Sequence, residues 1–502
     1  MDLVHSVILG FQASLQPINL LYCLIGVTIG TLTGVLPGIG PTGAMALLLP
    51  ATFHAPPLAS IIMLAGIYYG SQYGGSTTSI LVNIPGEPSS IVTCFDGNQM
   101  ARQGRAGPAL GISAFGSFIA GTIGLVGLML LARPLANLAL SFGPPEFFSL
   151  MIMGLIILVY LTQKSLTKAI CMGALGLILS YVGTDLISGQ IRYTFDIDPL
   201  LDGIGIVPIV MGLFGVTEVF ENLEETVETS LYQTHIKGLL PSRKDWAASI
   251  WPIIRGTVIG FFLGILPGGG AVLASFVAYA VEKRISKHPE QFGKGAIEGV
   301  ASPESANNAA SSSAFIPLLS LGIPPNVVMA MLFAGLMIHG ITPGPLLLQN
   351  RPDIFWGVIA SMYVGNVMLL VLNLPMIGIW VQITKIPFRL LFPLIILICI
   401  IGVYSISNST FDLMVMIIFG VVGYIMKKCE YEPAPLILAY VLGPKMEQAM
   451  RQSLIMSDGS FTIFIVRPIS GVCLAVAAFL LITAVTGFSK KKRLAVLPDE
   501  TI

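Results

Sequence analysis

The stretch GVLPGIG at residues 34–40 decides the fold of this 502-residue chain, because it returns as GILPGGG at residues 264–270. The surrounding segments, 26–40 and 256–270, align without a gap. The residues of the first copy that are identical in the second are Gly26, Ile29, Gly30, Gly34, Leu36, Pro37, Gly38 and Gly40. Such a dense match indicates an internal repeat.

Each copy predicts a helix that is broken near its end. The glycines lie four residues apart, so another helix can approach that face closely. The steps Pro37-Gly38 and Pro267-Gly268 then interrupt the helix, because proline removes a backbone hydrogen bond and collides with the preceding turn. We therefore expect one broken helix over residues 26–53 and a second over residues 250–282.

The composition is that of an integral membrane protein. Apolar residues make up 54% of the chain and charged residues 10%, whereas soluble domains have about a quarter charged. Runs such as residues 112–132 and 357–381 are long enough to cross a hydrocarbon core of about 30 Å. We expect an all-α, multi-pass protein with roughly 10 to 14 membrane segments, some of them re-entrant hairpins.

A hydroxyl-rich, hairpin-like segment is predicted after each break, at residues 66–90 and 299–326. Both are rich in Ser, Thr and Asn, and both end in Ile-Pro, at Ile84-Pro85 and Ile323-Pro324. Broken helices at corresponding places in two halves mark the central binding site of many secondary transporters. The doubled pattern therefore favours a transporter.

Basic residues indicate that the two copies are inverted. Residues 52–60, after the first break, contain no Lys or Arg, whereas residues 281–295, after the second, contain four. Conversely, Arg102 and Arg105 follow the first hydroxyl-rich segment, and Arg351 alone follows the second. Because Lys and Arg favour short cytoplasmic loops, the opposite bias predicts opposite orientations.

The predicted organisation is a first repeat half at residues 1–220, a cytoplasmic linker at 221–246 and a second half at 247–502. Each half begins with a broken helix and a hydroxyl-rich segment and continues with further spans, to residue 220 and to residue 487. A basic tail follows the last span.

The candidate site lies where these features meet. Irregular backbone survives in a membrane only where protein buries it or where it lines a cavity, and helix N-termini there attract anions. Predicted substrate-binding residues are Ser76, Thr77, Thr78, Asn83, Asn307, Asn308, Ser311 and Ser312. Predicted ion-binding positions, through carbonyls, are Gly38, Gly40, Gly268 and Gly270, next to the helix breaks Pro37 and Pro267.

Two carboxyl groups near these segments have open roles. Glu87, in the sequence PGEP, is either solvated or functional, and Glu304 either caps the following helix or takes part in ion coupling. The hydroxyl residues have an alternative role as well, since Ser, Thr and Asn in membrane helices bond to the backbone or join helices.

Other function classes find little support in the sequence. The net charge is zero, so no basic surface indicates nucleic acid binding. The five histidines form no paired ligand set, the six cysteines are scattered, and no nucleophile elbow is present, so we expect no enzyme, cofactor or metal centre apart from a possible sodium site. The alternatives to a transporter are an intramembrane enzyme and an anion channel.

The chain resembles the large membrane subunit of the tripartite tricarboxylate transporter family. The resemblance rests on GVLPGIGP, GSQYGGSTTSILVNIPGE, GILPGGGA and the string FGKGAIEGVASPESANNA, and it extends over nearly the whole chain. The chain departs from the family pattern at residues 311–314, where glycine is commoner, and at residues 322–326, where GIPG is usual.

The resemblance implies a function and partners. It implies a bacterial inner-membrane importer of citrate or other di- and tricarboxylates, driven by a sodium or proton gradient. It also implies a small membrane subunit with about four spans and a periplasmic solute-binding protein. Related carriers imply an elevator-type movement, by analogy at the level of the fold.

Overall fold

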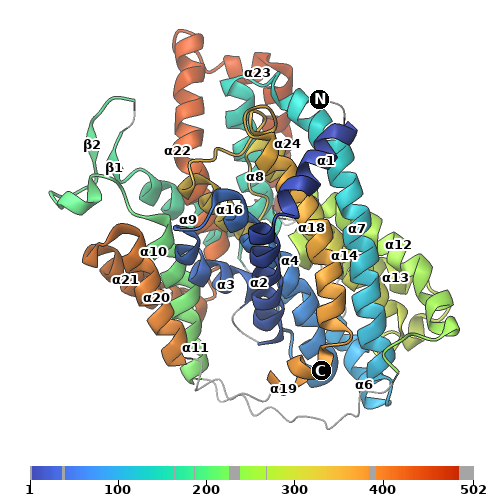
Figure 1. The fold of residues 1–502 in the computed structure, drawn as a ribbon. Coiled ribbons are helices and arrows are strands. Elements are labelled where there is room, and N and C mark those ends of the chain that lie inside the picture. Colours follow the sequence, from blue (N-terminus) through green and yellow to red (C-terminus); the bar gives the residue numbers. More distant parts are fainter. Residues whose placement is uncertain are drawn as a thin grey trace.

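The architecture was taken from a computed structural model of the chain. It describes residues 3–36, 40–161, 165–185, 187–224, 238–266, 268, 270–383 and 392–485. Within these residues the chain is a helical bundle with one small hairpin of two strands that projects from its side (Figure 1).

The elements follow one another along the chain with short connections. The first are α1 Leu3–Ser14, α2 Pro17–Val35, α3 Gly40–Leu48, α4 Pro57–Val82, α5 Ile91–Thr93, α6 Gln99–Arg102, α7 Ala106–Ala139, α8 Pro144–Leu161, α9 Leu166–Ser180, β1 Gly183–Thr184, β2 Ile191–Arg192, α10 Ile206–Val210 and α11 Thr217–Glu224. The remaining α-helices are α12 Arg243–Ile265, α13 Gly270–Ile285, α14 Glu298–Ser313, α15 Phe315–Leu321, α16 Val327–Ile338, α17 Leu347–Asn350, α18 Pro352–Asn373, α19 Ile377–Ile383, α20 Phe392–Ser407, α21 Thr410–Lys428, α22 Pro433–Met456, α23 Ile463–Val466 and α24 Pro468–Val485. Short 3₁₀ or π segments are η1 Pro50–Thr52, η2 Pro88–Ser90, η3 Cys94–Asn98, η4 Asp198–Leu200, η5 Met211–Val216 and η6 Pro289–Gln291.

Several helices are long and apolar enough to cross a bilayer. Among the described residues these are α2, α7, α12, α18 and α21, and five shorter apolar helices accompany them. Their outward faces carry large apolar side chains such as Phe262, Val367 and Phe479. A multi-pass helical membrane protein is therefore the class of fold, as the composition predicted.

The first glycine helix packs directly against the backbone of α4. A Cβ atom added at Gly26, Gly30 or Gly34 would lie 2.4, 2.6 or 2.3 Å from the carbonyl oxygen of Met63, Ile67 or Ser71, respectively. Since the partner numbers rise together, α2 and α4 run in the same direction. We call these two helices the first pair.

The second glycine helix packs against α14 in the same way. A Cβ atom added at Gly256, Gly260 or Gly264 would lie 2.2, 2.1 or 2.3 Å from the carbonyl oxygen of Ser302, Ala306 or Ala310, respectively. The glycine spacing therefore predicted both close approaches correctly. Helices α12 and α14 are parallel to each other and form the second pair.

The two pairs meet through α4 and α14, which run in opposite directions. Along α4, from its C-terminal part toward its N-terminus, Ser76 contacts Glu304, Gln72 contacts Asn307, and Tyr68 contacts Ser311. Falling numbers on α4 thus match rising numbers on α14. The second pair therefore runs in the opposite direction to the first. The inverted repeat that the Lys and Arg distribution favours stays a prediction, and this direction is compatible with it.

The hydroxyl-rich segments are helices rather than hairpin-like segments, and this part of the prediction was wrong. Residues 66–82 belong to the continuous helix α4, which ends only at Asn83 with a left-handed backbone (φ 60°). Residues 299–321 form α14 and α15, with a break at Ala314. Helix is stable here because the partner glycine helix buries the small residues of each segment.

The chain is helical on either side of each predicted break. Helices α2 and α3 flank the first break, and α12 and α13 flank the second. Pro37, Gly38 and Pro267 themselves lie outside the described residues, as do residues 225–237 of the predicted linker and the basic tail. Helix α11 extends into the predicted linker and ends at Glu224, and α12 begins within it at Arg243.

Candidate functional site

A buried polar cluster lies where the two pairs cross. It contains two carboxyl groups, two amides and three hydroxyl groups, and each of these residues is at most 5% exposed. We call it the carboxylate cluster and define it as Gln72, Ser76, Glu87, Ser89, Thr93, Glu304 and Asn307. Its members come from α4, η2, α5 and α14, so the site exists only in the folded protein.

Glu304 is surrounded by hydroxyl donors. Pro303 lies inside α14, and Glu304 follows it on the face toward α4. Its carboxylate accepts hydrogen bonds from Ser76 and Thr93, and Ser113 on α7 is a further donor. Glu304 therefore joins α14 to three segments of the first half of the chain, and it does not serve as a cap of α14.

Glu87 lies in the turn after α4 and faces the same space. It caps η2, since the Ser89 N–H donates to its Oε2 at 3.2 Å, and the Ser89 hydroxyl donates to its Oε1. The amide nitrogen of Asn307 donates to Oε1 at 3.3 Å. Glu87 is 5% exposed, so of its two predicted roles the solvated one is wrong.

The electrostatics of the cluster are unusual for a buried site. In the described part of the chain, neither Glu87 nor Glu304 forms an ion pair with a basic side chain. By contrast, the buried Glu282 of α13 pairs with Arg255, Nε to Oε2 at 3.0 Å. An unpaired buried carboxylate costs several kcal/mol, and ionisable groups in such places mark functional sites.

Asp96 shows the other way in which this fold stabilises a buried carboxylate. Its Oδ1 accepts the N–H groups of Gly293, Gly295 and Ala296 at 2.8 to 2.9 Å. The Tyr279 hydroxyl donates to Oδ2 at 2.9 Å. Asp96 is thus fully satisfied and holds the loop before α14 against η3, which makes it structural.

The predicted substrate-binding residues divide into three groups. Ser76 and Asn307 belong to the carboxylate cluster. Asn308 donates to Ser117 on α7 at 2.7 Å. The others do not converge on one point: Thr77 is buried on α4, Asn83 is an exposed helix end, and Thr78, Ser311 and Ser312 donate to the backbone of their own helices.

The glycines at the breaks have the backbone that glycine favours. Gly40, Gly268 and Gly270 have φ of 58°, 77° and 50°. Among the described residues, a Cβ atom added at Gly40 or Gly270 would meet no atom within 4 Å. The Gly268 N–H donates to the carbonyl of Pro325 at 2.7 Å, which joins this break to the loop after Ile323-Pro324.

Sequence reasoning missed Gln72, Ser89 and Thr93. A usable signal was present, because Gln72 and Ser76 are four residues apart on one helix face, as are Ser89 and Thr93. Gln72 also lies within an apolar segment, where an amide needs a partner.

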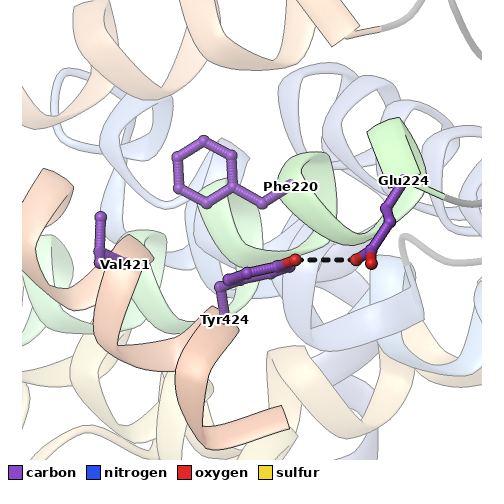
Figure 2. A pocket seen from close by; sticks show the side chains of 4 residues that line it. All are labelled: Phe220, Glu224, Val421 and Tyr424. Atoms are coloured by element: carbon purple, nitrogen blue, oxygen red, sulfur yellow. Dashed lines mark hydrogen bonds between the residues drawn. The ribbon is translucent and has the colours of Figure 1, made fainter. Parts of the chain in front are cut away.

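A separate hollow lies away from the cluster, between α11 and α21. It has a volume of about 460 Å³ and is lined by Phe220, Glu224, Val421 and Tyr424, as Figure 2 shows. The Tyr424 hydroxyl donates to Glu224 at 2.8 Å. Its four residues offer no second charged group toward the opening, so we do not regard it as the functional site. In the parts of the chain that the structure describes, no group of three or more His, Cys, Asp or Glu side chains forms a metal centre.

Comparison with known proteins gives a consistent result. Residues 20–438 match the tripartite tricarboxylate transporter TctA family. The chain is 49% identical over 500 residues, all of both proteins, to an uncharacterised 52.8 kDa protein from the TAR-I ttuC' 3' region of Agrobacterium vitis. It is 50% identical over 234 residues to an uncharacterised protein from the TAR-II ttuC' 3' region, covering 47% of this chain and 97% of that protein. No solved structure matches.

Proposed function

This chain belongs to the tripartite tricarboxylate transporter TctA family, and on that premise we propose that it imports citrate or a related di- or tricarboxylate. The import is driven by a sodium or proton gradient. The observation that carries the proposal is the pair of inverted glycine helices that cross at a buried polar cluster, which is the arrangement of a secondary transporter's central site.

The solute binds beside the cluster, toward the first turns of α3 and α13. Both helices begin at a glycine, Gly40 and Gly270, and helix N-termini carry partial positive charge that suits carboxylates. Thr77 contributes a further hydroxyl, whereas the hydrogen atoms of Thr78, Asn308 and Ser312 are donated within the protein. This arrangement supports a solute site built from helix ends and neutral donors, without an arginine clamp.

The transport cycle that this proposal implies is of the elevator type, with the two crossed pairs carrying the solute against the outer helices. The partners are a small four-span membrane subunit and a periplasmic solute-binding protein, and the membrane is the bacterial inner membrane. The family is the support for these partners, since a tripartite system needs membrane and periplasmic binding subunits.

The experiment that tests the function is uptake of labelled citrate by liposomes. They contain this chain, its small membrane partner and the cognate binding protein, with and without an inward sodium gradient at fixed pH. A second series applies an inward proton gradient without sodium. Accumulation that requires the binding protein and one gradient is expected.

Two results would contradict the proposal. Citrate flux that follows only its own gradient, at a rate that is independent of the binding protein, would show a channel. Conversion of the carboxylate inside the liposomes would show an enzyme. If the binding protein holds another carboxylate tightly, the same series is repeated with that compound.

A further inference from the structure

We propose that the carboxylate cluster binds the coupling cation, a sodium ion or a proton, and that it is not part of the solute site. This inference rests on the proposed function, because a coupling cation presupposes an ion-driven transporter. It assigns Glu87 and Glu304 as the anionic groups and Gln72, Ser76 and Asn307 as the neutral groups around them. The predicted role of Ser76 and Asn307 changes accordingly, from binding solute to orienting these carboxylates.

The first argument is charge. A di- or tricarboxylate brings negative charge, and the two glutamates at the crossing would repel it whenever they are ionised, because like charges repel strongly in a protein interior. The hydrogen atoms of Ser76 and Asn307 are already directed at the carboxylates. A cation is attracted to this arrangement for the same reasons.

The second argument is the kind of ligand that the cluster offers. Around the carboxylates of Glu87 and Glu304 lie the buried hydroxyl groups of Ser76, Ser89 and Thr93 and the side-chain amide of Asn307. Carboxylate, hydroxyl and amide oxygens are the ligands that hard cations prefer.

The third argument is the position of the cluster between the pairs. Glu87 follows α4 and Glu304 lies on α14, so a cation between them bridges the two inverted pairs. It also neutralises the charge next to the proposed solute site, so that an anionic solute can approach. This gives a physical route to coupling, in which the cation binds first and the carboxylate second.

Cation binding can be measured on the purified full-length chain without any solute. Labelled sodium binding is measured at pH 8, and proton uptake is measured by acid titration from pH 8 to pH 5 in potassium buffer. The variants are Glu304→Gln and Glu87→Gln. Glu298→Gln is the matched control, because Glu298 lies on the same helix outside the cluster.

Two results support the proposal and identify the ion. Saturable sodium binding that weakens about tenfold or more in both cluster variants, but not in the control, identifies a sodium site; even outer-shell changes at metal sites cost roughly 10- to 100-fold. Absence of sodium binding, with proton uptake that is lost in both variants alone, identifies a proton site. Thermal unfolding of each variant checks folding, and Glu304→Asp is expected to restore part of the binding.

The proposal is overturned if folded cluster variants bind sodium and protons as the wild type does. It is also overturned if the wild type binds neither ion while its solute binding depends on Glu304. Because these readouts need no solute, failure of citrate uptake in liposomes would contradict the proposed function and leave the cation result standing.

Discussion

The loop after Ile84-Pro85 carries Glu87, whereas the corresponding loop after Ile323-Pro324 carries Asn326 at the same place. Both side chains cap a helix: Glu87 accepts from Ser89 N–H, and Asn326 accepts from Met329 N–H at 2.9 Å. Each side chain also contacts the other helix pair, Glu87 through Asn307 on α14 and Asn326 through Tyr68 on α4. The first loop therefore caps a helix with a buried carboxyl group, Glu87, whereas the second caps a helix with an uncharged amide, Asn326.

The same difference appears on the helices that cross. Counted from Ile67 and Ala306, whose carbonyls face Gly30 and Gly260, position 72 corresponds to 311 and position 68 to 307. The contacts Gln72 with Asn307 and Ser311 with Tyr68 are thus related by symmetry. Glu304, however, corresponds to Ala65.

Two corresponding places at the crossing are therefore chemically unequal. One holds the carboxyl groups of Glu87 and Glu304, and the other holds Asn326 and Ala65. The repeat explains the shared backbone, and the departures from it show where charge was added.

The largest effect is expected from breaking either glycine contact. Gly30→Leu and Gly260→Leu should both abolish folded protein, because the added side chain meets backbone 2.6 or 2.1 Å from its Cβ, beyond the roughly 1 to 3 kcal/mol of ordinary overpacking. Yield of monodisperse protein in detergent is the measurement. Gly173→Leu, with open space around it, is the control, and a tolerated Gly260→Leu would contradict the contact.

The next largest effect should distinguish the loop that carries Glu87 from the corresponding loop that carries Asn326. Glu87→Asn keeps a helix cap but removes the charge, so ion-driven accumulation of solute should fall about tenfold or more. Asn326→Ser also keeps a cap and should leave accumulation within about a factor of two. Equal losses in the two variants would show that both loops serve only as caps.

A smaller effect is expected at Asp96, a buried carboxylate whose role is structural. Asp96→Asn replaces one acceptor oxygen by a donor next to N–H groups, which should destabilise the protein by about 1 to 3 kcal/mol without changing cation binding. The melting temperature and labelled sodium binding of the same sample test this. Loss of binding at an unchanged melting temperature would show that Asp96 belongs to the ion site.

The smallest effect concerns Asp185, a carboxylate outside the membrane segments with basic partners. The Ser188 hydroxyl, and then Arg192 and Arg451, hold the pKa of Asp185 well below its usual range. A lowered pKa in the folded state stabilises the attached β1–β2 hairpin above the ordinary carboxyl pKa of about 3.9, and this contribution is lost as the pH falls through the lowered value.

Hydrogen exchange in residues 187–203 should therefore be unchanged between pH 7 and pH 5, after correction for the intrinsic rate. In Asp185→Asn the exchange should be a few-fold faster already at pH 7. Citrate uptake should be the same in both proteins. A hairpin that loosens between pH 7 and pH 5 in the wild type would contradict the direction of this shift.

The repeated phrase allowed much of the central fold to be predicted, because glycine spacing and proline breaks act locally. Gly26, Gly30 and Gly34 required a close partner helix, and α4 is that partner. The sequence also singled out Ser76 and Asn307, which lie in the carboxylate cluster, since polar residues in apolar segments need partners; their predicted binding of solute stays a prediction. It did not predict that α4 stays helical to Val82.

The carboxylate cluster itself required tertiary information. Which face of α4 meets α14, and in which register, depends on packing between helices that are more than 200 positions apart in the sequence. Thr93 and Ser89 lie on short segments whose positions depend on the turn after Asn83. Local sequence patterns therefore identified some of the polar residues, whereas the packing of α4 against α14 determined how these residues are arranged in space.

The glycine contacts also have a mechanical consequence. Within each pair, glycines at three successive turns of one helix lie against backbone carbonyl groups of the other. This close packing prevents one helix from sliding along the other. The two helices of each pair are therefore expected to move as one rigid body. In the elevator cycle proposed above, the two pairs would then move together against the outer helices, and no movement would occur within a pair.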